Sequence, residues 1–86
     1  MKSFELEIVT PEAKVFASSV QSVTVPGTMG SFQVLYNHAP IISTLGQGKV
    51  KIVQENGETL TYNTRDGVIE VLKNKAIILV EKVIEA

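Results

Sequence analysis

The sequence predicts an all-β domain, either a β-sandwich or a barrel, and three observations indicate this fold class. Short segments of alternating apolar and polar residues recur at roughly eight- to ten-residue intervals, with turn-forming residues between them. Apolar residues do not repeat with a helical period over any long segment. The 86 residues fit one domain, 1–86, and no linker or low-complexity tract divides them.

The first half of the chain supplies five of these segments. Alternation is clearest at the start, where Phe4, Leu6 and Ile8 are separated by two glutamates. Proline and glycine then mark the breaks, as at Pro26-Gly27. The strands expected here are Phe4–Ile8, Val15–Ser18, Ser22–Val25, Ser31–Val34 and Ile41–Leu45.

The second half supplies four more, for about nine short strands in all. Asn56-Gly57 is the strongest local signal, because this dipeptide readily adopts the left-handed backbone of a two-residue type I′ hairpin. Arg65-Asp66-Gly67 and Lys73-Asn74-Lys75 are predicted as further turns. The strands expected between these turns are Lys49–Gln54, Thr59–Asn63, Val68–Leu72 and Ala76–Val80.

Two of the predicted strands are apolar on both faces, whereas a sandwich strand normally alternates. Val68–Leu72 is apolar on nearly both faces, and Ala76–Val80 is apolar throughout. Either a loop of the chain covers the outer face of these strands, or a partner protein does. The sequence alone leaves both explanations open.

Composition excludes several classes of function. The chain has 8 basic and 9 acidic residues, a net charge of −1 and no run of like charge, so it lacks the basic stripe of a nucleic-acid-binding protein. It also lacks a polybasic membrane tether and an apolar run long enough to span a bilayer, so no direct membrane insertion is expected. The absence of cysteine rules out disulfides and thiolate zinc sites.

Catalytic and metal sites are not predicted either. His38 is the only histidine, and the stretch 15–54 around it contains no Asp or Glu that could orient it or share a metal with it. Glu5 and Glu7 fall on one strand face, where solvated side chains are expected rather than the opposed acids of a glycosidase. We therefore expect no enzyme activity and no cofactor.

The glycine-flanked loop Gly27-Thr28-Met29-Gly30 superficially resembles a phosphate-binding loop. A true P-loop continues with Lys-Ser/Thr and a helix, but Ser31 and a strand-like segment follow here, so nucleotide binding is rejected. Met29 is unusual, since loop tips are normally polar. It either folds back onto the core or serves as an apolar contact at an interface.

A longer segment around this loop resembles the epsilon subunit of F-type ATP synthases. The segment 26–42 is similar to the family pattern Gly-Glu-x-Gly-Ile/Val-Leu-x-Gly-His-Ala-Pro-Leu-Leu, and its His38-Ala39-Pro40 is quite specific. Further matches are Leu6–Glu12, Val15-Phe16, Gly48–Ile52 and Gly67–Val71, so the likeness runs from about Phe4 to Val83.

This resemblance implies a non-catalytic subunit of a proton-translocating ATP synthase. The fold would be a flattened β-sandwich of about ten short strands in two sheets. The domain would join the central stalk by binding the gamma subunit and the c-subunit ring, and would turn with the rotor. It would be peripheral, on the cytoplasmic face of the bacterial inner membrane. Carried over by position, the c-ring contacts are Met29, Gly30 and Ser31, and the gamma or stalk contacts are Thr10, His38, Ser43 and Arg65.

Four positions depart from the family pattern. Ser31 replaces the usual acid after the loop glycine, which would weaken any charge pairing with a basic c-ring loop. Asn37 replaces the glycine before the histidine, but asparagine tolerates the left-handed conformation, so the turn is expected to survive. Gln33 and Tyr36 stand where glycine and proline are common.

Typical bacterial members of the family continue into a two-helix hairpin that inhibits ATP hydrolysis in many of them and binds ATP in some. The present sequence ends at Ala86, directly after the predicted sandwich. The resemblance therefore leads us to expect no C-terminal helical domain, no inhibitory function and no ATP binding.

The main alternative is a free-standing β-sandwich module that binds a protein or a sugar. Sugar-binding modules usually present exposed tryptophan or tyrosine platforms, but the chain has no tryptophan, and its two tyrosines are Tyr36 and Tyr62. A small enzyme is a third and poorly supported possibility.

Overall fold

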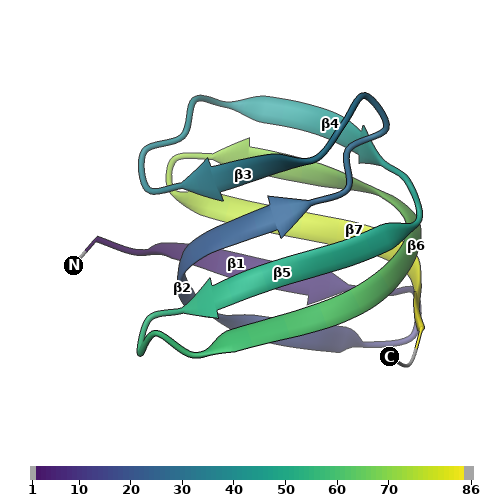
Figure 1. Cartoon of the computed structure of the whole chain (residues 1–86), viewed down its shortest axis with the longest axis horizontal. Helices are drawn as coiled ribbons and strands as arrows, with labels where there is room; N and C mark the ends of the chain where they lie inside the picture. The colour runs from purple at the N-terminus through teal and green to yellow at the C-terminus, as the bar shows by residue number, and fades with distance from the viewer. Residues whose placement is uncertain (1, 85–86) are drawn as a thin grey trace.

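The computed structural model describes residues 2–84, and they form seven β-strands (Figure 1). The all-β prediction is confirmed for this part of the chain. The strands are β1 (Phe4–Val9), β2 (Lys14–Val25), β3 (Phe32–Leu35), β4 (Ile41–Leu45), β5 (Gly48–Gln54), β6 (Thr59–Leu72) and β7 (Lys75–Ile84).

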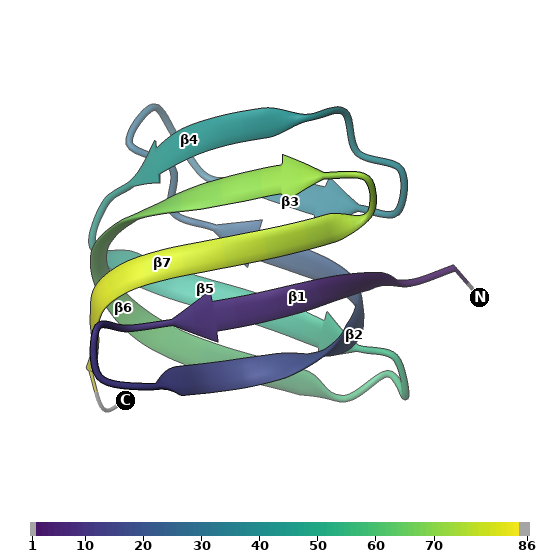
Figure 2. The ribbon, with the colours of Figure 1, turned by 180° about the vertical axis from the view of Figure 1, so that it is seen from behind.

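Strand pairing joins all seven strands into one sheet that closes on itself. The order is β1-β7-β6-β5-β2-β3, and β1 also pairs with β2, while β4 is attached to β6. β1 runs parallel to β7, and the other pairs are antiparallel. The closed sheet has two opposite sides, or layers, in the figures. One layer shows β3, β5 and the second half of β2 (Figure 1), and the other shows β4, β7 and β1 (Figure 2).

The prediction of about nine or ten short strands is wrong, because two long strands turn the corners between the layers. In β2 the register shifts between Val20 and Ser22, and Ser22 and Val23 are both buried, so the inward face changes at this point. In β6 the buried residues Thr64 and Ile69 are an odd number of positions apart, with the positive φ of Asp66 (26°) between them. Irregularities of this kind let one strand pass from one layer to the other.

The expected turn at Arg65-Asp66-Gly67 is therefore a corner inside β6 and does not separate two strands. Neighbouring pairs keep one register through it, since Arg65 pairs with Lys82 and Gly67 with Val80. The hydrogen-bonded ladder to β7 thus holds the bend on both sides.

Two hairpin turns were placed correctly, but the type I′ geometry predicted for Asn56-Gly57 is wrong. After β5, the Gly57 amide donates to the Gln54 carbonyl (2.9 Å) and Gly57 has φ of +92°, which is a type I turn followed by a left-handed glycine. The type I′ geometry occurs instead at Lys73-Asn74, where both residues have positive φ (50° and 60°). Asparagine favours this conformation, and the tight two-residue turn sets the register of β6 and β7.

The core fills the space between the two layers. Its members are the inward-facing residues of the alternating segments, so the alternation in the sequence correctly identifies most of them. They are Phe4, Leu6, Ile8, Val20, Val23, Val25, Val34, Leu45, Val50, Ile52, Ile69, Val71, Ala76, Ile78 and Val80.

Candidate docking surfaces

The loop between β2 and β3 is firmly attached to the end of β4. Gly27 forms a bridge with Leu45, and the Thr28 amide donates to the Thr44 carbonyl (3.0 Å). The hydroxyl groups of the two threonines lie 2.6 Å apart. A turn follows, closed by the Gly30 amide donating to the Gly27 carbonyl (2.9 Å). The loop therefore has a defined conformation and is not a flexible connection.

Met29 lies in this turn and is fully exposed (100%), so the alternative in which it folds back onto the core is wrong. Its neighbours Gly30 and Ser31 are exposed as well. Gly27 makes the turn possible, because a Cβ there would lie 2.9 Å from the Phe32 ring. The result is an apolar side chain held in solvent on a fixed loop, as expected of a contact residue.

His38 lies in the loop between β3 and β4. Its amide donates to the Leu35 carbonyl (3.1 Å), and its ring Nδ1 lies 2.7 Å from the Ala39 carbonyl oxygen, so the tautomer with the proton on Nδ1 donates to that oxygen. Asn37 has φ of 63°, which confirms that asparagine supports the turn where the family pattern has glycine. The backbone thus fixes both His38 and its ring.

The three other predicted stalk contacts lie on separate elements. Thr10 directly follows β1, and its Oγ1 accepts from the Ala13 amide (3.2 Å), which closes the turn to β2. Ser43 is half-buried on β4, opposite Ile69. Arg65 is exposed on β6 at the corner.

The predicted contact residues do not form one surface. The turn after β1, the loop after β2 and the corner of β6 lie at one end of the molecule, whereas the loop between β3 and β4 lies at the other (Figures 1 and 2). Thr10 and Arg65 are therefore at the same end as Met29, and His38 is at the opposite end. The longest dimension is 31 Å, so a partner that contacts both ends must be an extended one.

Sequence reasoning did not name the apolar residues on the outer face of β4, β6 and β7 as contact residues. Ile42, Leu72 and Leu79 are 73%, 51% and 53% exposed. No loop in the described part of the chain covers these side chains, so the loop explanation for the two-sided apolar strands is wrong for Leu72 and Leu79. The missing alternation of apolar and polar residues already indicated that these strands have an apolar outer face. Which residues lie on that face follows only from the strand register.

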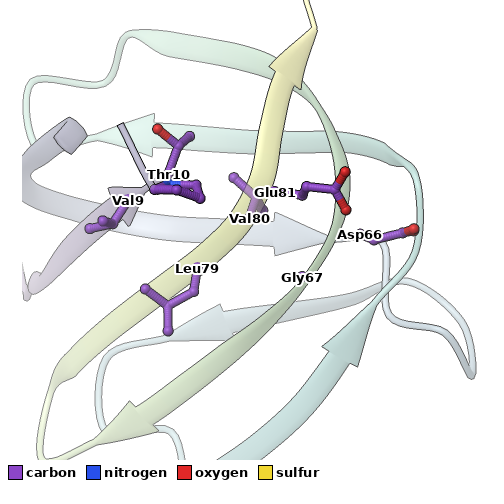
Figure 3. Close-up of a pocket in the computed structure, with 8 residues that line it drawn as sticks. Val9, Thr10, Asp66, Gly67, Leu79, Val80 and Glu81 are labelled. Atoms are coloured by element: carbon purple, nitrogen blue, oxygen red, sulfur yellow. The ribbon is translucent and has the colours of Figure 1, made fainter. Parts of the chain in front are cut away.

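Two hollows flank this outer face. One, of about 380 Å³, lies where the end of β1 meets β6 and β7 (Figure 3) and is lined by Val9, Thr10, Pro11, Asp66, Gly67, Leu79, Val80 and Glu81. The other, of about 430 Å³, lies between β4 and the end of β6 and is lined by Pro40, Ile41, Ile42, Glu70, Val71 and Leu72. Both are shallow and mostly apolar, as docking surfaces are.

The tyrosines are not arranged as sugar platforms. Tyr62 is half-buried and packs edge-on against Phe16, with ring centroids 6.4 Å apart. Tyr36 is also half-buried, and the Lys2 ammonium group lies 5.2 Å from its ring centre. Neither ring is an open, flat platform for a sugar.

Within residues 2–84, acidic and histidine side chains do not gather in a group that could hold a metal ion. The same residues include no helix long and apolar enough to cross a membrane. The fold and its surfaces together define a small all-β domain whose distinctive exposed groups are apolar and suited to protein contact.

Comparison with known proteins identifies the family. Residues 3–86 match the family model described as ATP synthase, Delta/Epsilon chain, beta-sandwich domain. The chain belongs to this family, as the resemblance predicted.

Relatives at 40–45% identity fall into two groups by length. The ATP synthase epsilon chain of Chlorobaculum tepidum is 43% identical over 82 residues, which are 95% of this chain and 93% of that relative. The epsilon chain of Pelotomaculum thermopropionicum is 45% identical over 78 residues, which are 91% of this chain and 58% of the relative.

Solved structures show the same fold at lower identity. A chain of the Euglena gracilis mitochondrial ATP synthase, in a structure of OSCP, F1 and c-ring, superposes with a TM-score of 0.90 at 18% identity. The match covers 95% of this chain and 52% of the Euglena chain. At this identity the comparison supports the fold alone.

Proposed function

We propose that this chain is a rotor subunit in the central stalk of a proton-translocating F-type ATP synthase, where it couples the gamma subunit to the c-ring. The observation that carries the proposal is the apolar outer face of β4, β6 and β7, with Ile42, Leu72 and Leu79 in solvent. A domain of 86 residues gains stability when a permanent partner covers such a face. Membership of an ATP synthase family supports another subunit of that complex as the partner.

The c-ring contact is proposed at Met29, Gly30 and Ser31. An exposed methionine adapts its shape to an uneven surface, and the fixed loop keeps the ordering cost low. Since Ser31 carries no charge, this contact depends on shape and apolar burial rather than on ion pairs.

The gamma contact is proposed along the length of the domain. Thr10 and Arg65 stand at one end, His38 at the other, and Ser43 on β4. A gamma subunit that contacts both ends would run along the length of the domain, and the apolar outer face of β4, β6 and β7 lies between the two ends (Figure 2).

The role proposed for the domain is mechanical. A closed sheet resists shear, because bending one strand strains the hydrogen-bonded ladders on both of its sides. Torque on the c-ring side can then reach gamma without any bond being made or broken. The subunit would be non-catalytic, would bind no ATP and would lie at the cytoplasmic face of the bacterial inner membrane.

We further propose that coupling proceeds without an inhibitory helical hairpin. The support is the length of two relatives, from Chlorobaculum tepidum and Chlorobium limicola, which are matched over 93% of their own length. The measurement is the rate of ATP hydrolysis by F1 from the same organism, with and without the subunit. Strong inhibition by the added subunit would contradict this proposal.

The main test is binding of the wild-type chain to purified gamma subunit and to purified c-ring, each from the same organism. We expect both to bind. Met29→Asp should weaken c-ring binding because a charge replaces the apolar contact, and it should leave gamma binding unchanged. Thr61→Asp, on an exposed position of β6, is the matched control. Failure of the wild-type chain to bind gamma would refute the rotor assignment.

A further inference from the structure

The hollow at the end of β1 has a mostly apolar lining, with two carboxylates at its rim. Figure 3 shows Val9 and Leu79 on one side and the carboxylates of Glu81 and Asp66 on the other. Leu79 remains 53% exposed. At about 380 Å³, the hollow is within the range of ligand-binding pockets, which is roughly 300–1,000 Å³.

Asp66 and Glu81 are exposed acids on the neighbouring strands β6 and β7. Because Arg65 pairs with Lys82 and Gly67 pairs with Val80, Asp66 and Glu81 occupy opposite positions between these two pairs. Both ion pairs found among residues 2–84 belong to Glu7, which leaves Asp66 and Glu81 without a salt-bridge partner in the described part of the chain.

This arrangement gives the rim of the hollow two like charges on neighbouring strands. Like charges directly opposite each other on neighbouring strands are destabilising. The adjoining cations Arg65 and Lys82 make no ion pair with the two acids within residues 2–84. A cation placed between the two carboxylates by a partner would remove this repulsion.

We propose that the hollow binds a segment of the gamma subunit in which an apolar side chain is accompanied by a lysine or arginine. The apolar side chain would cover Leu79 and Val9, and the cation would lie between Asp66 and Glu81. This inference rests on the proposed function, because Thr10 lines the hollow and Arg65 adjoins it, and both are proposed gamma contacts.

The negative charge of Asp66 and Glu81 favours a basic segment over other occupants of the hollow. The same two carboxylates repel nucleic-acid and lipid phosphates. An apolar side chain alone would leave both acids unpaired beside a desolvated surface, which carries an energetic cost. A basic and apolar segment matches both the apolar lining and the acidic rim of the hollow.

The experiment measures the affinity of the full chain for purified gamma subunit in low salt and in 0.5 M NaCl, a condition that screens exposed charges. The double variant Asp66→Asn/Glu81→Gln should bind gamma about tenfold more weakly in low salt, and the difference should shrink in high salt. Asparagine tolerates the positive φ at position 66, so the corner of β6 is retained.

The matched control is Glu55→Gln/Glu58→Gln, which removes the same charge at the hairpin after β5, at the opposite end of the molecule (Figure 1). It should change the affinity less than twofold. Leu79→Ser should weaken binding equally in both salt conditions, because it removes apolar contact rather than charge. Thermal unfolding of each variant verifies that it is folded.

The outcomes separate this inference from the proposed function. If the wild-type chain binds gamma and Asp66→Asn/Glu81→Gln binds equally well in low salt, the inference is overturned and the rotor assignment stands. If the wild-type chain does not bind gamma, the rotor assignment itself is refuted. If sedimentation shows that the wild-type chain pairs with itself and the double variant does not, the occupant is a second copy, and the gamma segment is excluded.

Discussion

Asn74 donates and accepts hydrogen bonds with the same distant residue, Asn37. The Asn37 amide donates to Asn74 Oδ1 (2.7 Å), and Asn74 Nδ2 donates to Asn37 Oδ1 (2.9 Å). Both residues have positive φ, and the Asn74 carbonyl also accepts from the Glu5 amide (3.0 Å). The turn between β6 and β7 thus holds the loop that carries His38.

This pair gives a first prediction about stability. Asn37→Gly and Asn74→Gly keep the left-handed backbone and remove the side-chain bonds. Because either substitution breaks the shared contact, the double variant should be less destabilised than the sum of the singles, with a coupling of about 1 kcal/mol. Urea unfolding of all four proteins measures it. Lys73→Gly, in the same turn but without such bonds, is the control, and strictly additive losses would contradict the coupling.

Thr64 gives a second prediction. Its side chain is fully buried, and among the described residues its Oγ1 has no hydrogen-bond partner. Thr64→Val replaces the unpaired hydroxyl with a methyl group of similar shape and should raise the free energy of unfolding by about 1 kcal/mol. The control is Thr61→Val on the exposed face of the same strand, which should change stability little. A destabilised Thr64→Val protein would mean that the hydroxyl is satisfied.

The sequence predicted the fold class and the core well, because alternation reports directly on which side chains face inward. The sequence predicted too many strands, in part because Arg65-Asp66-Gly67 was interpreted as a turn between two strands. These residues are typical of a turn, but the ladder to β7 on both sides keeps the strand continuous. The local strand and turn propensities of a sequence do not report such tertiary pairing.

The docking surfaces could be predicted only in part. Met29 was recognisable because an apolar residue stood between glycines, and the apolar strands signalled an uncovered face. The hollow beside Leu79 could not be predicted, since residues of β1, β6 and β7 line it together only after these strands have paired. The Asn37–Asn74 contact could not be predicted either, because the two turns that carry these residues approach each other only after the sheet has closed.

Gly67 gives a third prediction, from close packing at the corner of β6. A Cβ at this position would overlap the Leu79 carbonyl oxygen and lie 2.9 Å from Val80 Cγ1. Gly67→Ala should therefore force β6 and β7 apart and lower the free energy of unfolding by about 1–3 kcal/mol. Gly46→Ala is the matched control, because the nearest atom to its added methyl group is 3.9 Å away. Equal stabilities of the two variants in urea unfolding would refute the packing argument.

Gly27 gives the last prediction, which connects loop geometry to docking. A Cβ there would lie 2.6 Å from the Gly30 carbonyl oxygen and 2.9 Å from the Phe32 ring, so Gly27→Ala must change the turn that presents Met29. The methionine itself remains, but it is no longer held in the same place. We expect Gly27→Ala to weaken binding to purified c-ring about as much as Met29→Asp does, because a misplaced contact costs affinity as a missing one does. Gly46→Ala adds the same methyl group in the neighbouring turn and should bind normally. Wild-type affinity of a folded Gly27→Ala protein would show that the fixed position of Met29 does not matter for docking.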